Sequence, residues 1–408
     1  MNFKNKLLTM TLILFLIVSQ KNTTIYGSSF LDIPVWNENG TTEVSASLST
    51  DTFLNIESES AILIEENTGE ILFEKNSHQK LHPASITKIM TILLIMENLK
   101  DNTISLNDTV PCSENASSMG GSQIWLSTNE TLTVEEMLKA ICVVSANDCA
   151  VAMAEYISGS EEAFVILMNE KAKALGMNDT TFKNCHGIDE DGHMSSSYDI
   201  SIMSRELLKN HPEIKKYTSI WMDSLRNGSS QLVNTNKLIR TYEGATGLKT
   251  GSTSLALYNL SASATRDNLS LISVVLKAPT TELRFKEAKL LLDYGFNKYI
   301  YKNLAEKNSI CETVDVYKGT EDKTDLVFES SSGAIIEKNN TKNIETIITI
   351  KENITAPIYK NEVLGNIEYL IDGKTISKVN LVSSKDIPKK TFTNFFKEIN
   401  NKYFRLLS

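Results

Sequence analysis

The stretch LALYNLSASATRDNLSLISVVLKA, residues 255–278, contains two apolar runs on either side of Arg266-Asp267-Asn268. Asp and Asn favour turns, and each run has the length of a strand, so we predict two adjacent antiparallel strands. A second pair of apolar runs, in AILIEENTGEILFEKN at 61–76, surrounds a turn at Asn67-Thr68-Gly69. This pattern predicts a β-hairpin far from the first strand pair along the chain.

The chain between these strands predicts helices. Apolar residues recur at helical spacing in several segments, which are 85–99, 132–144, 148–157, 161–175 and 197–208. A further helix is expected over 281–296 and should end at Gly295, since glycine often terminates helices. Strands at both ends of residues 56–303 with helices between them predict one α/β (α+β) domain whose sheet is assembled from distant segments.

The character of the sequence changes after residue 303. Short apolar runs alternate with polar turns, and no long helical pattern is present; the runs are TVDVY, DLVFE, ETIITI and KVNLV. We therefore predict a small all-β domain over residues 304–385.

The N-terminus has the pattern of an export signal. Lys4 and Lys6 precede an uncharged apolar run from Leu7 to Val18, which is too short for an ordinary membrane-spanning helix. We predict a secretory signal peptide over residues 1–27, with an uncleaved anchor as the alternative. Residues 28–55 are polar and are predicted to be a linker.

The C-terminus predicts an amphipathic helix over residues 386–408. Aromatic and aliphatic residues recur at helical spacing from Phe392 to Leu407, and several Lys and Arg residues accompany them. A basic amphipathic helix rich in Phe is typical of a segment that lies in a membrane interface. A terminal helix that packs on its own domain is the alternative.

Composition excludes some classes of partner. The 408 residues are 41% hydrophobic and 22% charged, which is typical of a globular protein. The formal net charge of −9 argues against nucleic acid as a general partner, because phosphate binding requires a basic surface. The five cysteines have long spacings and form no metal-binding motif, so we expect neither a disulfide framework nor a metal site.

Three short motifs contain side chains suited to acyl transfer. They are Ser85-Ile86-Thr87-Lys88, Ser145-Ala146-Asn147 and Lys249-Thr250-Gly251. The S-x-x-K spacing also occurs at Ser77 and Lys80, so the spacing alone decides nothing. Its context is different, because Ser77 lies in a polar segment interrupted by proline, whereas Ser85 begins an apolar helix.

The structural context predicts where these groups point. Residues three apart share a helix face, so Lys88 is expected beside the Ser85 hydroxyl. Ser145 and Asn147 lie at the break between two helices, where polar side chains can face a cleft. Gly251 lies next to a predicted strand pair, where the absence of a side chain allows a ligand to approach the backbone closely.

In this order, S-x-x-K, S-x-N and K-T-G resemble the motifs of penicillin-binding proteins and serine β-lactamases. More narrowly, the chain resembles the low-molecular-weight penicillin-binding proteins, which are serine-type D-alanyl-D-alanine carboxypeptidases. The supporting stretches are HPASITKIMT, VVSANDCAVAMAE, TTFKNCHGIDEDGHMSSSYDIS, TGLKTGST and ELRFKEAKLLLDYGF. The small β domain and the amphipathic tail are also similar to that family's layout.

The resemblance implies a role for each matching residue. Ser85 would be the nucleophile, Lys88 its base, and Ser145 a proton relay to the leaving amine. The substrate-binding group would comprise Asn147, Lys249, Thr250, Gly251, Ser252 and Arg284. Among these, Asn147 would bind the substrate backbone, and Thr250 and Arg284 would bind its terminal carboxylate. The backbone N–H groups of Ser85 and Ser252 would form the oxyanion hole, and Ser252 departs from the His that is frequent in the family.

The resemblance implies an exported enzyme at the outer face of the bacterial cytoplasmic membrane. Its substrate would be the peptidoglycan stem peptide, β-lactam antibiotics would acylate it, and no cofactor would be needed. Three alternatives remain, which are a serine β-lactamase, a DD-endopeptidase and a non-catalytic wall-binding protein. Class A β-lactamases use an additional Glu, and the candidates Glu161, Glu162 and Glu170 lie on helical patterns without the E-x-x-x-N arrangement. We interpret His186 and Gly187 as part of a turn-forming loop near the cleft.

Overall fold

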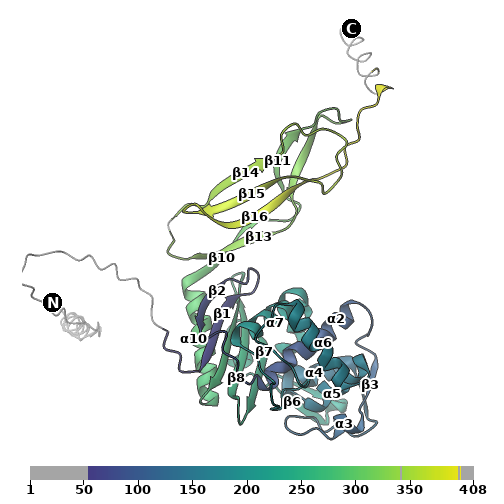
Figure 1. Ribbon diagram of the computed structural model, residues 1–408, viewed down its shortest axis with the longest axis vertical. Coiled ribbons are helices and arrows are strands. Elements are labelled where there is room, and N and C mark those ends of the chain that lie inside the picture. Colours follow the sequence, from purple (N-terminus) through teal and green to yellow (C-terminus); the bar gives the residue numbers. More distant parts are fainter. Residues whose placement is uncertain (1–53, 341, 394–395, 397–408) are drawn as a thin grey trace, which may run out of the picture. The chain divides into compact units, whose positions relative to one another are not determined.

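The computed structural model describes residues 54–340, 342–393 and 396 (Figure 1). The predicted signal peptide at 1–27, nearly all of the linker and most of the C-terminal amphipathic helix lie outside the described residues. No helix of the described part is long and apolar enough to cross a membrane.

A five-stranded antiparallel sheet forms the centre of the first part of the chain (Figure 1). Its strands are β1 (Ser60–Glu65), β2 (Ile71–Lys75), β7 (Ala245–Thr253), β8 (Leu257–Arg266) and β9 (Leu269–Ala278). The spatial order is β2-β1-β9-β8-β7. Both predicted strand pairs are confirmed, and they join directly, since β1 pairs with β9. The sheet is therefore assembled from the two ends of this part of the chain, as expected.

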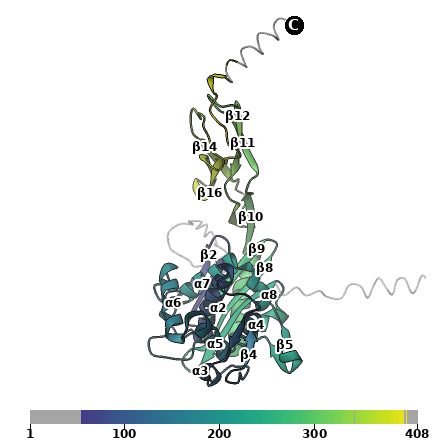
Figure 2. The same cartoon turned by 90° about the vertical axis from the view of Figure 1, so that its right-hand side faces the viewer.

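Strands β1 and β9 are buried along nearly their whole length because both faces of the sheet are covered. In β1, Ala61 and Leu63 contact one hydrophobic cluster, whereas Ile62 and Ile64 contact the other. Successive strand side chains point to opposite faces, so this alternation assigns one cluster to each face. Helix α10 (Thr281–Lys298) contributes to the first cluster, and the other long helices cover the opposite face (Figure 2).

The helices of the opposite face confirm the predicted segments. The long ones are α2 (Lys88–Lys100), α4 (Val134–Val144), α5 (Asn147–Ser158), α6 (Glu161–Ala174) and α7 (Ser197–Asn210). Short elements complete this part, which are η1 (Ala84–Thr87), β3 (Thr109–Pro111), α3 (Glu114–Ser117), β4 (Thr131–Thr133), η2 (Pro212–Ile214), α8 (Lys215–Thr218), β5 (Met222–Leu225), η3 (Arg226–Gly228), β6 (Ser230–Val233) and α9 (Leu238–Thr241). Helix α2 is buried from Lys88 to Met96, which explains its almost continuous apolar sequence.

The prediction that the helix over residues 281–296 ends at Gly295 is wrong. Helix α10 continues to Lys298, and Gly295 lies inside it against the sheet. A Cβ atom at Gly295 would lie 2.5 Å from Leu271 Cδ1 and 3.1 Å from Leu63 Cδ2. Glycine is present here because it allows the helix to approach β9 and β1 closely, not because the helix ends.

The second part of the chain is rich in β-structure, as predicted. Its strands are β10 (Tyr299–Ala305), β11 (Ile310–Asp315), β12 (Lys323–Phe328), β13 (Ser332–Glu337), β14 (Glu345–Ile350), β15 (Val363–Ile371) and β16 (Lys374–Ser383). Five of them form an antiparallel sheet in the order β11-β12-β16-β15-β14, and β10 pairs with β13. The four short apolar runs noted after residue 303 all contribute to strands, in β11, β12, β14 and β16.

Candidate active site

Ser85 lies on the short 3-10 helix η1, immediately before the buried helix α2. The ammonium nitrogen of Lys88, in the first turn of α2, lies 3.1 Å from Ser85 Oγ. The predicted proximity of these two side chains is thus present in the structure. The competing pair is not arranged in this way, since Ser77 Oγ donates a hydrogen bond to Glu74.

Lys88 is completely buried and makes two further hydrogen bonds. Its Nζ donates to Asn147 Oδ1 at 2.6 Å and to the backbone carbonyl of His186 at 2.6 Å. Burial lowers the pKa of Lys88 from 10.5 to about 7, although Cys185 and Asp148 act in the opposite direction. A neutral amine retains two N–H donors and one lone pair. With the two N–H groups held by Asn147 and His186, the lone pair is left for the Ser85 hydroxyl.

Ser145 occupies the predicted break between α4 and α5. It adopts a left-handed backbone conformation with φ of 65°, and this conformation ends α4. Its Oγ is buried and has no hydrogen-bond partner. An unsatisfied buried hydroxyl is rare, so it is a candidate to bind a substrate group or to carry a proton.

The side chain of Asn147 is already occupied inside the protein. Its Oδ1 accepts from Lys88, and its Nδ2 donates to the carbonyl of Gly120 at 2.7 Å. The role of Asn147 in substrate binding stays a prediction. Its observed contacts hold Lys88 in place, and only the second hydrogen of Nδ2 remains for a ligand.

Lys249, Thr250, Gly251 and Ser252 lie on β7, the edge strand of the sheet. The motif precedes the predicted strand pair β8–β9 and is itself part of a third strand, which pairs with β8. Burial lowers the pKa of Lys249 well below its usual value, and the positive charges of Lys88 and Arg284 lower it further. Its Nζ donates to the Thr250 carbonyl at 2.9 Å.

Gly251 brings the edge strand against the turn that carries the nucleophile. A Cβ atom at this position would lie 3.0 Å from the backbone nitrogens of Ser85 and Ile86 and from the carbonyl oxygen of Pro83. The sequence predicts that a ligand approaches the backbone at Gly251, but the structure places the η1 backbone there instead. As a result, Ser85 and the K-T-G motif are adjacent although more than 160 residues separate them in the sequence.

Arg284, on α10, is buried behind the K-T-G strand. Its Nη1 donates to the carbonyls of Gly251 at 3.2 Å and Asn259 at 3.3 Å, and its Nε has no partner. Burial lowers its pKa to about 10, so the guanidinium still carries its charge at neutral pH. Arg284 thus braces the β7 backbone and adds positive charge beside Lys249.

Several residues that the sequence analysis did not single out complete this arrangement. Thr250 Oγ1 donates to Thr235 Oγ1 at 2.8 Å, and Asn259 Nδ2 donates to the carbonyls of His82 at 2.9 Å and Pro83 at 3.1 Å. Asp148 accepts from the backbone nitrogens of Ile124 and Leu126. No spacing rule could have identified these groups, because their contacts are to backbone or to distant segments.

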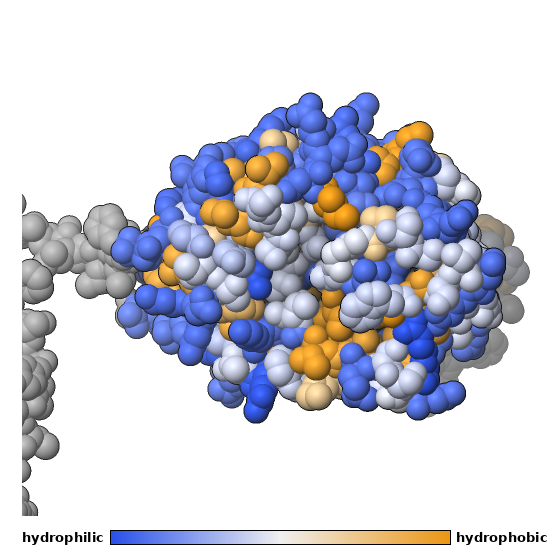
Figure 3. Space-filling view, turned by 90° about the horizontal axis from the view of Figure 1, so that it is seen from below, coloured by the Kyte–Doolittle hydropathy of each residue, from blue (hydrophilic) through white to orange (hydrophobic). Residues whose placement is uncertain are grey.

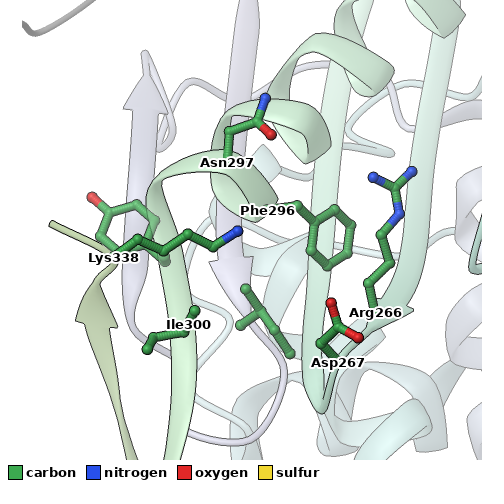
Figure 4. A pocket seen from close by; sticks show the side chains of 8 residues that line it. Arg266, Asp267, Phe296, Asn297, Ile300 and Lys338 are labelled. Atoms are coloured by element: carbon green, nitrogen blue, oxygen red, sulfur yellow. The ribbon is translucent and has the colours of Figure 1, made fainter.

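Two cavities of the described part lie away from these residues. One of about 190 Å³ lies beside the β8–β9 turn and the end of α10, lined by Arg266, Phe296 and Lys338 among others (Figure 4). A larger one of about 450 Å³ lies at the far end of α2, beside Leu99 and Tyr217. Neither is lined by a residue of the three motifs, so chemistry and not cavity size locates the candidate site.

The hydropathy of the surface, the possible metal ligands and the state of the cysteines can be compared with the sequence-based expectations. Hydrophilic residues dominate the face shown in Figure 3, and its apolar residues form several separate patches. No group of three or more His, Cys, Asp or Glu residues in the described part could hold a metal ion. All five cysteines are free thiols.

Two families match consecutive parts of the chain. Residues 44–280 match the family described as D-alanyl-D-alanine carboxypeptidase, and residues 299–389 match the penicillin-binding protein 5 C-terminal domain. The D-alanyl-D-alanine carboxypeptidase DacF of Bacillus subtilis is 44% identical over 345 residues, covering 84% of this chain and 88% of that protein. Escherichia coli DacA is 33% identical, covering 86% of this chain and 88% of DacA.

Solved structures show the same relationship. Penicillin-binding protein 5 of Haemophilus influenzae is 32% identical with a TM-score of 0.72, covering 82% of this chain and 98% of that one. Penicillin-binding protein D2 of Listeria monocytogenes, solved in an ampicillin-bound form, is 32% identical with a TM-score of 0.55. It covers 60% of this chain and 99% of its own.

Proposed function

The chain belongs to the D-alanyl-D-alanine carboxypeptidase family, and we propose that it removes the terminal D-alanine from peptidoglycan stem pentapeptides through an acyl-enzyme on Ser85. The observation that supports this assignment most directly is the 3.1 Å contact between Ser85 Oγ and the buried Lys88 amine. An unaided serine hydroxyl is a weak nucleophile, and a neutral amine beside it can accept its proton.

Acylation then follows from the arrangement of these groups. Ser85 Oγ attacks the carbonyl carbon of the scissile peptide bond, and its proton passes to Lys88. When the C–N bond breaks, Ser145 donates a proton to the departing D-alanine amine and is itself reprotonated from Lys88. Water subsequently attacks the ester, releases the shortened peptide and restores the Ser85 hydroxyl.

The remaining residues of the site would bind the substrate. Thr250 would donate a hydrogen bond to the terminal carboxylate, and Arg284 would supply positive charge around it; the carboxylate would in turn favour the ammonium form of the buried Lys249. The backbone N–H groups of Ser85 and Ser252 would stabilise the oxyanion, and this role requires no particular side chain at position 252. Asn147 would chiefly hold Lys88, in keeping with its observed contacts.

The same nucleophile would react with β-lactam antibiotics, because their strained amide resembles the scissile dipeptide. The ampicillin-bound Listeria relative supports this expectation.

We further propose that the protein is exported and acts at the outer face of the bacterial cytoplasmic membrane, with residues 386–408 lying on the membrane surface. The basic amphipathic sequence of that segment is the support for this placement.

A β-lactamase is the principal alternative, and the position of Glu161 argues against it. Its Oε1 accepts a hydrogen bond from the Cys185 backbone nitrogen at 3.0 Å and lies 3.4 Å from His186 Nε2. This carboxylate is therefore occupied by the 185–186 backbone and imidazole, rather than being free to activate a hydrolytic water. An endopeptidase would use the same residues and differ only in its substrate.

The proposal is tested with a defined pentapeptide ending in D-alanyl-D-alanine. Mass analysis should show loss of one alanine, and a Ser85→Ala variant should lose both this activity and covalent labelling by penicillin. Undiminished release of D-alanine by Ser85→Ala would refute Ser85 as the nucleophile. Nitrocefin distinguishes the alternative, since rapid sustained turnover would indicate a β-lactamase and a long-lived adduct a peptidase.

A further inference from the structure

The loop of residues 184–188 forms one wall around the serine–lysine pair. The carbonyl of His186 accepts a hydrogen bond from Lys88, and the carbonyl of Cys185 accepts one from Thr91 Oγ1 at 2.6 Å. Gly187 lies directly against the backbone of Ala84 and Ser85. Lys88 can therefore make one of its three hydrogen bonds only while the His186 carbonyl points toward it.

Glu161, at the start of α6, holds this loop from the side opposite Lys88. Its Oε1 accepts from the Cys185 backbone nitrogen and lies 3.4 Å from His186 Nε2. The other ring nitrogen of His186, Nδ1, accepts from the Ile188 backbone nitrogen at 3.1 Å. The ring proton is consequently on Nε2, where it faces the Glu161 carboxylate.

The imidazole of His186 remains neutral in this position. Burial, together with the neighbouring Lys88 and His193 side chains, lowers its pKa to about 3. Glu161 thus accepts a hydrogen bond from the Cys185 N–H and lies beside the neutral His186 Nε2–H, and this arrangement does not depend on protonating the ring. Glu161 therefore connects α6 to the Asn184–Cys185 peptide and to the His186 side chain.

We propose that Glu161 is a positioning residue for the acylation step, because it fixes the His186 carbonyl that orients Lys88. If this carbonyl turns away, neutral Lys88 loses the acceptor of one N–H, and its lone pair is no longer held toward Ser85 Oγ. The inference rests on the proposed roles of Ser85 and Lys88. It predicts a slower chemical step with little change in the binding of substrate, since the contacts of Glu161 among the described residues are with Cys185 and His186 and not with the K-T-G strand.

Three variants of Glu161 separate the effect of side-chain length from the effect of its negative charge. Glu161→Gln keeps the length of the side chain and an oxygen acceptor, so its acylation rate should stay within about threefold of the original. Glu161→Asp keeps the charge but is one methylene too short to reach both donors, and Glu161→Ala loses both contacts. A displacement of about 1 Å at a reacting group costs on the order of 100-fold, so we expect losses of about 10-fold for Asp and up to about 100-fold for Ala.

The matched control is Glu162→Ala, which removes the adjacent, solvent-exposed carboxylate of the same helix turn. Its acylation rate should be unchanged. The full-length protein is mixed rapidly with a fluorescent penicillin over a range of concentrations, which separates the saturating acylation rate from the half-saturating concentration. Melting temperatures are measured for each variant.

The proposal predicts that the saturating rate falls in the order Gln, Asp, Ala while the half-saturating concentration stays within about threefold. It is overturned if Glu161→Ala acylates at the original rate, or if only the half-saturating concentration changes. If Glu161→Ala does not fold, the Gln and Asp variants still test the proposal. A purely electrostatic role of Glu161 would make acylation faster in Glu161→Asp than in Glu161→Gln, which is the reverse of the order proposed. Peptide mapping of the adduct first locates it on Ser85; an adduct elsewhere would refute the nucleophile assignment itself, independently of Glu161.

Discussion

Gly187 provides a quantitative test of how closely the loop approaches the nucleophile. Its backbone is left-handed, with φ of +89°, and a Cβ atom there would lie 2.0 Å from the carbonyl oxygen of Ala84 and 2.9 Å from the backbone nitrogen of Ser85. Both neighbours are backbone atoms, so neither can rotate away. A Gly187→Ala substitution must therefore move the loop and the η1 turn apart.

The size of this movement can be worked out from the contact. Real Cβ atoms essentially never approach another heavy atom closer than 3.0 Å, so the separation from Ala84 O must increase by at least 3.0 − 2.0 = 1.0 Å. A misplacement of about 1 Å at a catalytic group costs on the order of 100-fold in rate. The left-handed conformation adds about 1–2 kcal/mol of strain for alanine, which should lower the melting temperature.

Gly192→Ala is the control, because Gly192 has a similar φ of +77° but its Cβ would meet only the flexible end of the Lys183 side chain at 3.3 Å. Both variants therefore carry the left-handed strain, and only Gly187→Ala carries the backbone clash. Labelling by a fluorescent penicillin, followed over time, should be on the order of 100-fold slower in Gly187→Ala than in Gly192→Ala. Equal labelling rates in the two variants would show that the approach of this loop to Ser85 does not matter for acylation.

Three further outcomes are expected. Lys88 must be neutral to accept a proton, and burial lowers its pKa to about 7. The acylation rate should therefore rise as pH increases through about 7 and level off above it. A midpoint near the usual pKa of 10.5 would contradict this assignment. Arg284→Ala removes the donor to the Gly251 and Asn259 carbonyls, and loss of hydrogen bonds from a charged group should lower kcat/KM on the pentapeptide by about 10-fold or more; an unchanged kcat/KM would refute its role. Deletion of residues 388–408 should release the protein from anionic lipid vesicles while activity on a soluble peptide is retained, and equal vesicle binding by the truncated chain would disprove the anchor.

Local patterns in the sequence were sufficient for most of the fold. The apolar runs of β1 and β9 and the periodicity of α2 and α4 to α7 reflect burial, which each segment carries in its own composition. The end of α10 was missed because glycine has two uses, ending a helix or allowing close packing, and only the neighbouring side chains of Leu271 and Leu63 distinguish them. Strand β7, at an edge of the sheet, was missed because ATGLKTGST has no alternating apolar pattern.

The sequence by itself determined which chemical groups are available, since S-x-x-K on a helix start already places an amine beside a hydroxyl through local geometry. The tertiary structure alone decided what surrounds that amine. The His186 carbonyl, the Asn147 amide and the burial that lowers the Lys88 pKa come from segments about 60 to 100 residues away. Desolvation and the direction of a hydrogen bond depend on three-dimensional proximity, and no spacing within a single segment encodes them.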